Sequence, residues 1–165
     1  MVKFISAAEA ALFFEDNQSI MIGGFLKCGS PTMVIEELLK TPVKNLTLIG
    51  NDTSLPNSDR GKLICAYKIK KAIVSHIGTN PETVAQMNSG QLEVELTPQG
   101  SLAERIRAGG AGLGGILTPT GVGTDVAAGK QIINVDGTDY ILEKPLKADI
   151  ALVYATHADR FGNLS

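Results

Sequence analysis

Residues 20–31 read IMIGGFLKCGSP, an apolar segment that runs into three glycines and then stops at a proline. A short apolar run before a turn is typical of a buried strand. Pro31 suits the first turn of a helix, where its missing amide hydrogen is no loss, and Ser30 before it predicts the N-cap. We therefore expect a strand over residues 19–23, a glycine loop and then a helix.

Strands and helices alternate outward from this loop. Upstream, Ser6 and Glu9 have the spacing of a capping box, which predicts a short helix. Downstream, apolar or alternating segments predict strands, and a segment that opens on proline and ends on glycine predicts a helix between two of them. The expected strands cover residues 45–51, 70–76 and 92–97, the helix covers residues 81–90, and residues 61–68 fit either state.

A second capping box, Ser101 with Glu104, predicts a helix over residues 101–108. Two glycines follow it directly, Gly109 and Gly110, and glycine is the residue that most often ends a helix. We therefore expect the helix to end at this pair.

The remaining segment predicts a β-hairpin and a last strand. Residues 136–137 are Asp-Gly, which tolerates the positive φ angles of a type I′ turn, so residues 131–135 and 138–143 are expected to pair. A last strand is expected over residues 148–155. Alternating strands and helices favour a parallel sheet covered by helices. The sequence thus predicts an α/β fold, an open and mostly parallel sheet flanked by helices with an attached β-hairpin, in one domain over residues 1–165.

The charge balance gives no reason to expect a nucleic-acid partner. Lys plus Arg number 15 and Asp plus Glu number 17, a net charge of −2. The one basic cluster, Lys68 with Lys70 and Lys71, is interpreted as the solvated start of a strand. Apolar runs fall short of the about 20 residues that a membrane span needs, and residues 2–16 carry acidic groups inside their apolar part, unlike a secretory leader. We expect a cytoplasmic protein with no membrane partner.

Candidate metal ligands and nucleophiles stand alone in the sequence. His76 and His157 belong to no ligand cluster, and Cys28 and Cys65 form no CxxC pair, so no metal is expected. A Cys28 nucleophile with His76 as its base lacks an orienting acid. The capping box accounts for Glu104. The chain therefore offers no convincing nucleophile of its own.

Two glycine patterns could hold a ligand. Gly110, Gly112 and Gly115 satisfy GxGxxG, but they follow a helix and run into a strand-like segment, which is the wrong context for a dinucleotide. The loop of residues 23–29 lies where open α/β sheets collect ligands, beyond the carboxyl end of a strand and before a helix. Its glycines let backbone amides approach a ligand closely. A tight turn without a ligand is the alternative, and we favour binding.

Several longer motifs carry a resemblance to a known family. In order, they closely resemble the α subunits of family I (3-oxoacid) CoA-transferases, nearest to the acetate or butyrate:acetoacetate type. The resemblance covers essentially the whole chain. Its segments are residues 16–31 (DNQSIMIGGFLKCGSP), 49–57 (IGNDTSLPN), 75–83 (SHIGTNPET), 95–115 (ELTPQGSLAERIRAGGAGLGG), 117–124 (LTPTGVGT) and 142–153 (LEKPLKADIALV).

The resemblance implies roles for named residues. Gln99, expected at the end of the strand 92–97, matches the family's glutamine whose side-chain amide helps to stabilise an oxyanion. Asn51 and Gly100 are expected to line the substrate pocket. The glycine loop is expected to bind coenzyme A, with Lys27 adding a charge for a phosphate; the predicted binding residues are Gly23, Gly24, Phe25, Leu26, Lys27, Cys28 and Gly29.

The resemblance also implies a partner, the β subunit, which carries the nucleophilic glutamate. CoA would move between an acyl-CoA (acetoacetyl-, acetyl- or butyryl-CoA) and a free short-chain carboxylic acid by a ping-pong mechanism through a glutamyl-CoA thioester. The chain would be active only in that hetero-oligomer. It also stops before the last strand and helix that the resemblance leads us to expect.

Two other functions remain open on the same scaffold. One is an enzyme similar to sugar-phosphate isomerases, in which the glycine loops hold a phosphate and a carboxylate of this chain acts as the base. The other is a module that binds acyl-CoA without chemistry.

Overall fold

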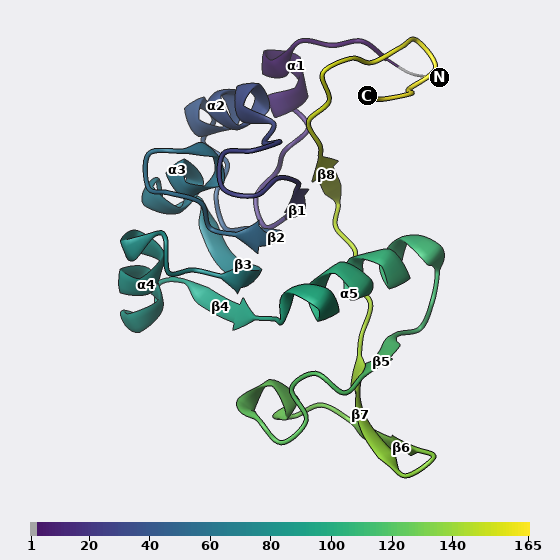
Figure 1. The fold of residues 1–165 in the computed structure, drawn as a ribbon. Coiled ribbons are helices and arrows are strands. Elements are labelled where there is room, and N and C mark those ends of the chain that lie inside the picture. Colours follow the sequence, from purple (N-terminus) through teal and green to yellow (C-terminus); the bar gives the residue numbers. More distant parts are fainter. Residues whose placement is uncertain (1–2) are drawn as a thin grey trace. The chain divides into compact units, whose positions relative to one another are not determined.

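The computed structural model describes residues 3–165 (Figure 1). They form two compact units, one made of the chain up to Glu95 together with Ala148–Ser165 and the other of Leu96–Lys147. The expectation of one family domain over residues 1–165 stays a prediction. None of the helices formed by residues 3–165 has the length and apolarity that crossing a membrane requires.

Five strands make the main sheet: β1 (Ser19–Ile22), β2 (Leu46–Asp52), β3 (Ile69–His76), β4 (Glu93–Leu96) and β8 (Ile150–Leu152). Their order is β4-β3-β2-β1-β8. β1 runs parallel to both β2 and β8, and β2 runs parallel to β3. The predicted mostly parallel sheet is confirmed.

The first unit also contains helices α1 (Ala7–Ala11), α2 (Thr32–Lys40), α3 (Asp59–Cys65) and α4 (Pro81–Asn88). Because the strand order advances in one direction and crossovers between parallel strands are right-handed, α2 and α3 lie on the same face of the sheet. α2 packs beside α1 and α3, and α3 beside α4 (Figure 1). The predicted capping box of Ser6 and Glu9 is present at the start of α1.

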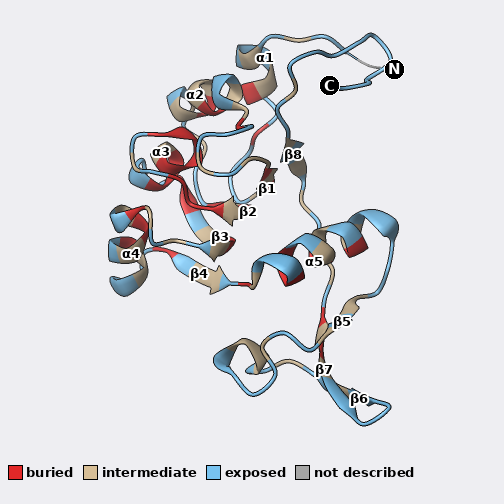
Figure 2. Ribbon diagram, viewed as in Figure 1, coloured by how far each residue is buried: buried red, intermediate tan, exposed pale blue. Residues whose placement is uncertain are grey.

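The core lies between this sheet and its helices. Ile20 of β1, Leu48 of β2, Ile35 of α2 and Leu63 of α3 belong to one cluster and are fully buried. Figure 2 shows the same concentration of buried residues over β1, β2, α2 and α3. Each such side chain contributes about 1.5–3 kcal/mol when it leaves water, so this cluster fixes the strand whose end leads into the glycine loop.

One detail of the first unit differs from the sequence-based expectation, and one assignment that the sequence left open is now decided. The N-cap of α2 is Pro31, which has no capping side chain, and the buried Ser30 hydroxyl finds no hydrogen-bond partner among the described residues. Residues 61–68, which fitted either state, fall mainly in the helix α3. The cap prediction was wrong because the chain bends into the helix one residue later than Ser30 would require.

Lys68 is not the solvated start of a strand that we expected. Its side chain is largely buried, and its ammonium donates to the carbonyls of Thr41 at 2.6 Å and Val43 at 2.9 Å, just after α2 ends. Burial lowers the pKa of Lys68 from its ordinary value. Lys68, Lys70 and Lys71 therefore do not form a basic surface patch, because the ammonium group of Lys68 binds backbone carbonyls of the protein.

The second unit consists of a long helix and a small antiparallel sheet. It contains α5 (Gln99–Ala111), β5 (Ile116–Thr118), a 3-10 turn (Asp125–Ala127), β6 (Ile132–Val135) and β7 (Thr138–Glu143). The sheet order is β5-β7-β6. β6 and β7 form the predicted hairpin, and Asp136 and Gly137 have φ angles of 51° and 82°, as a type I′ turn requires. β5 adds a third strand.

The helix α5 begins earlier and ends later than the sequence suggested. Its first residue is Gln99, its N-cap is Pro98, and the carbonyl of Pro98 accepts from the amide of Leu102 at 2.8 Å. The capping box of Ser101 and Glu104 is therefore wrong, because both residues already lie inside the helix. Gln99 correspondingly opens α5 and does not end a strand.

Gly109 and Gly110 do not end α5. The helix continues to Ala111, and Gly112 closes it with a left-handed φ of 71°. A Cβ atom on Gly109 would lie 1.9 Å from the carbonyl oxygen of Leu146, whereas one on Gly110 would meet nothing within 4 Å. Gly109 thus permits a close approach of two backbone segments, which the sequence does not distinguish from a helix stop.

Candidate functional site

The glycine loop follows β1, the strand at which the order of strands in the sheet reverses. From β1 the chain turns through α2 to β2 on one side, while β8 pairs with β1 on the other side. The carboxyl ends of strands at such a switch point are where open α/β sheets bind ligands. Gly23–Gly29 therefore occupy the position at which the fold favours a site.

The loop is a tight reversal with a fixed backbone. Phe25 and Cys28 exchange two backbone hydrogen bonds, both 2.9 Å long. Gly24 has a φ of 101°, and a Cβ atom there would lie 2.7 Å from the carbonyl oxygen of Cys28. Only glycine fits that position without strain. Phe25 is 62% exposed at the tip of the loop.

Arg60 of α3 donates hydrogen bonds to the backbone at the start of the loop. Its side chain is completely buried. Its NH1 group donates to the carbonyls of Ile22 at 3.1 Å and Gly23 at 3.0 Å, and its NH2 group donates to the carbonyl of Gly24 at 3.0 Å. One planar guanidinium group thus fixes three consecutive carbonyls at the end of β1.

Asp52, at the end of β2, is the counter-ion of Arg60. One carboxylate oxygen lies 3.4 Å from Nε of Arg60, and the other accepts from the amide of Leu26 at 3.1 Å. The amide of Ser54 donates to Asp52 at 2.6 Å. The buried charge of Arg60 is compensated, and the same carboxylate fastens the loop to the sheet.

Asn51 also contacts the loop. Its side-chain amide donates to the carbonyl of Gly24 at 2.7 Å. The structure therefore brings Asn51 together with the predicted loop residues. A role of Asn51 in lining the substrate pocket stays a prediction.

These contacts give the loop a consistent polarity. The carbonyls of residues 22–24 point toward Arg60 and Asn51. The amides of Gly24, Lys27 and Gly29, by contrast, donate to no acceptor within residues 3–165. A loop whose carbonyls are held inward and whose amides remain available is suited to an anionic or carbonyl oxygen.

Lys27 lines a cavity of about 270 Å³ next to the start of α2. Lys62 adds a second cation to the lining, while the carboxylate of Asp59 accepts from the Thr32 and Ser58 hydroxyls at 2.7 Å and 3.1 Å. Lys62 is also paired with Glu36, so Lys27 is the cation of this lining that is left to meet a ligand.

Gln99 and Gly100 belong to the second unit, in the first turn of α5. Gly100 faces open space, since a Cβ atom there would meet nothing within 4 Å. It lines a cavity of about 250 Å³ together with Ser101, Glu104, Ile116, Leu117, Thr118 and Thr120. Arg107 donates to Glu104 and lowers the pKa of that carboxylate, which is therefore charged at neutral pH.

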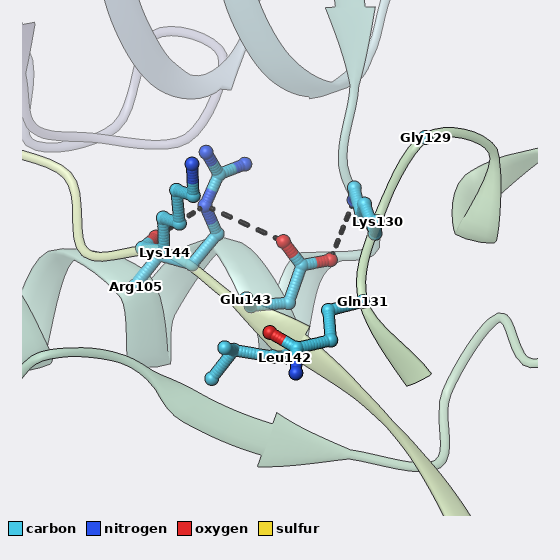
Figure 3. A pocket seen from close by; sticks show the side chains of 7 residues that line it. All are labelled: Arg105, Gly129, Lys130, Gln131, Leu142, Glu143 and Lys144. Carbon is cyan, nitrogen blue, oxygen red and sulfur yellow. Dashed lines mark hydrogen bonds and ion pairs between the residues drawn. The ribbon is translucent and has the colours of Figure 1, made fainter. Parts of the chain in front are cut away.

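The second unit also contains a buried carboxylate, Glu143, with two cationic neighbours (Figure 3). Glu143 of β7 lies 2.6 Å from Nζ of Lys130 and 3.7 Å from Nε of Arg105, which also donates to the carbonyl of Lys144 at 2.9 Å. These residues line a cavity of about 360 Å³. Arg105 ties α5 to β7 and to the residue after it, and Lys130 ties the segment before β6 to β7, so we assign the cluster a structural role.

Three buried charged residues were not predicted from the sequence: Arg60, Asp52 and Glu143. Arg60 and Asp52 lie in polar stretches, Ser-Asp-Arg-Gly-Lys and Asn-Asp-Thr-Ser, so no local signal marks them as buried. Glu143 follows the apolar run Tyr-Ile-Leu, and a charge in such a run could have been noticed, because charged side chains are rarely buried without a partner. Among residues 3–165, the structure brings together no group of three or more His, Cys, Asp and Glu side chains that could hold a metal. Cys28 and Cys65 are both free and exposed.

Comparison with known proteins gives a family match along the chain. The family model described as Coenzyme A transferase matches residues 4–165. The chain is 52% identical over 161 residues to the acetoacetyl-CoA:acetate/butyrate CoA transferase alpha subunit of Clostridium acetobutylicum, a match that covers 98% of the chain and 74% of that relative. It is 51% identical over 163 residues to the acetate CoA-transferase subunit alpha of Escherichia coli, covering 99% and 74%.

Solved structures share the fold at much lower identity. An acyl-CoA transferase of Escherichia coli, YdiF, matches with a TM-score of 0.80 at 23% identity, over 94% of this chain and 34% of that one. A glutaconate coenzyme A-transferase of Acidaminococcus fermentans matches with a TM-score of 0.83 at 17% identity, over 99% and 59%. A variant of the decarboxylase AibA/AibB matches with a TM-score of 0.83 at 23% identity, over 99% and 66%. At these identities the likeness shows the fold alone.

Proposed function

Because the chain belongs to the coenzyme A transferase family, we propose that it is the α subunit of a short-chain acyl CoA-transferase. It moves CoA between acetoacetyl-, acetyl- or butyryl-CoA and a free carboxylic acid. The observation that carries the proposal is the 52% identity to an acetoacetyl-CoA:acetate/butyrate transferase subunit over 98% of the chain. The fold alone does not carry it, since a decarboxylase shares that fold.

The partner is a β subunit that supplies the nucleophilic glutamate. Its carboxylate attacks the thioester carbonyl, and CoA thiolate leaves to give an acyl-glutamyl anhydride. The thiolate then attacks the glutamyl carbonyl, which releases the first acid and leaves a glutamyl-CoA thioester. A second acid takes CoA by the reverse steps, so turnover is ping-pong. No nucleophile of this chain enters the scheme.

The glycine loop is the part of this chain that binds CoA. Its support is the polarity of the loop: Arg60 and Asn51 hold the carbonyls of residues 22–24, while the amides of Gly24, Lys27 and Gly29 have no acceptor within residues 3–165. Lys27, beside a cavity of about 270 Å³ that Lys62 also lines, adds positive charge for a phosphate.

Gln99 assists the chemistry by stabilising negative charge. Both nucleophilic attacks place charge on a carbonyl oxygen, which calls for donors fixed in advance. Gln99 opens α5, and the positive end of a helix dipole at that position supports the same charge. Asn51 and Gly100 are proposed to line the acid pocket. We also propose that the protein is cytoplasmic.

Transferase assays with acetoacetyl-CoA and acetate test the proposal. This chain alone is expected to be inactive, and its complex with the β subunit is expected to form acetyl-CoA with ping-pong kinetics. Turnover by the isolated chain would contradict the assignment of the nucleophile. The isomerase-like and pure-binding alternatives are disfavoured because the relatives at about half identity are named CoA transferases.

A further inference from the structure

The start of α5 leaves hydrogen-bond donors unused. Four amides at a helix N-terminus have no partner within the helix, and a capping side chain normally serves one of them. The N-cap of α5 is Pro98, and no side chain of residues 3–165 caps this end. The first intrahelical bond at this end is the one from Leu102 to Pro98. The amides of Gly100 and Ser101 therefore have no capping acceptor in the part of the chain that the structure describes.

Ser101 adds a second and independent observation. Its side chain is 4% exposed, and its hydroxyl has no hydrogen-bond partner within residues 3–165. Leaving a buried polar group unsatisfied is costly, so buried hydroxyls are almost always bonded. Ser101 lines the cavity of about 250 Å³ together with Gly100, which is also in the first turn of this helix. An unused buried donor beside unused amides indicates that a ligand oxygen completes the site.

The remaining walls of this cavity restrict the size and kind of ligand. Ile116 and Leu117 of β5 give it an apolar side, while Thr118 and Thr120 give it hydroxyls. At about 250 Å³ it lies below the roughly 300–1,000 Å³ of pockets that hold drug-sized ligands. A cavity of this size and lining suits a short acid, whose alkyl chain would contact the apolar side chains of β5.

Glu104 places one negative charge on the rim of the same cavity. Arg107 binds this carboxylate through Nε at 2.9 Å and through NH2 at 2.8 Å. Pairing with Arg107 weakens the repulsion that Glu104 exerts on an anion without removing it. The charge of the ligand can therefore be tested through Glu104, with an effect opposite in sign to that of Ser101.

We infer that the cavity at the N-terminus of α5 binds the carboxylate of the free short-chain acid, and that the Ser101 hydroxyl donates a hydrogen bond to it. This inference rests on the proposed function and deepens it. It makes Ser101 a substrate-binding residue for the acid half-reaction.

The test measures the dissociation constant of butyrate for the complex of both subunits, by NMR line broadening of isotope-labelled butyrate. Ser101→Ala is expected to raise this constant about tenfold, the value of a hydrogen bond to a charged group. Ser101→Thr keeps the hydroxyl and is expected to restore most of the affinity. Glu104→Gln is expected to lower the constant about two- to fivefold by removing a like charge. Thr138→Val, which deletes an exposed hydroxyl in β7, is the matched control and is expected to change nothing.

Steady-state kinetics on the same variants separate this inference from the proposed function. Ser101→Ala is expected to raise KM for the acid while KM for acyl-CoA stays constant, a split that a merely structural loss would not give. An active wild-type complex whose butyrate affinity is the same in Ser101→Ala overturns the inference alone. A complex that lacks transferase activity overturns the proposed function, while Ser101-dependent butyrate binding would still support the site. Binding of inorganic phosphate in place of butyrate, with the same dependence on Ser101, overturns the assignment to a carboxylic acid.

Discussion

At the scale of single residues, Arg60 satisfies the carbonyls of Ile22, Gly23 and Gly24 with one side chain. Its charge is balanced by Asp52, which in turn holds the amide of Leu26. The glycine loop therefore has its shape before any ligand arrives. Such preorganisation lowers the cost of binding, because the ligand does not have to order the loop.

Replacing Arg60 is expected to unfold this arrangement. Arg60→Met leaves Asp52 as a buried charge without its counter-ion, which costs about 3–5 kcal/mol of unfolding free energy. Urea unfolding followed by circular dichroism measures the loss. Lys62→Met is the control: its ion pair with Glu36 joins side chains that are 36% and 40% exposed, so the expected loss is below about 1 kcal/mol. Equal losses in the two variants would contradict the role of Arg60.

Gly24 and Gly23 make a matched pair within the loop. Gly24→Ala forces a side chain into a left-handed conformation, which costs at least about 1–2 kcal/mol, and its Cβ would also lie 2.7 Å from the carbonyl of Cys28. Gly23→Ala meets only ordinary contacts of 3.5 Å and longer, so we expect a change within about 1 kcal/mol. Urea midpoints measure both, and a tolerated Gly24→Ala would show that the loop is not fixed as described.

At the scale of elements, α5 illustrates what local sequence signals miss. The Ser101 and Glu104 pattern is a valid helix start, but Pro98 is an equally good one, and the structure uses Pro98. The two adjacent glycines are a valid helix stop, but Gly109 serves a contact with Leu146 from a distant part of the sequence. Local patterns identified this helix and misplaced both of its ends, since tertiary contacts decided between competing signals.

Alanine substitutions at Gly109 and Gly110 are expected to have opposite effects on stability. Gly110→Ala adds helix propensity where there is free space and is expected to stabilise the protein by about 0.5–1 kcal/mol. Gly109→Ala places a Cβ atom 1.9 Å from the Leu146 carbonyl and is expected to destabilise it by at least about 1–3 kcal/mol. Thermal and urea unfolding distinguish the two. Two stabilised variants would mean that α5 and Leu146 are not in close contact.

The strand β8 is tied to β1 by an acid-sensitive contact. The amide and hydroxyl of Ser19 both donate to Asp149 at 2.7 Å, and they lower the pKa of Asp149 below its ordinary value of 3.8. A depressed folded-state pKa means that the stabilisation is present above pH 3.8 and is lost as the pH falls through the folded value.

Asp149→Asn removes this titration and keeps an acceptor oxygen. The wild type is expected to have the higher urea midpoint at neutral pH, and the difference is expected to close as the pH drops below 3.8. A difference that stays constant down to the acid limit would show that Asp149 does not titrate in contact with Ser19.

At the scale of the whole molecule, the parallel sheet, the hairpin and the position of the glycine loop were predictable, because each depends on periodicity and turn chemistry within a short segment. The support beneath the loop was not. Arg60 acts on carbonyls about 37 residues away, such as that of Gly23, and only the folded chain brings them together. The unused hydroxyl of Ser101 was hidden for a related reason, since a correct-looking capping box had already explained it.

The central proposal is that this chain binds CoA while a partner chain carries the reactive carboxylate. Mass spectrometry of proteolytic peptides, after the two-subunit complex is incubated with acetoacetyl-CoA and no acceptor acid, tests it most directly. The expected result is a CoA thioester on one glutamate of the β subunit, with unmodified peptides from this chain. A CoA adduct on any residue of this chain, with the β subunit unmodified, would contradict it.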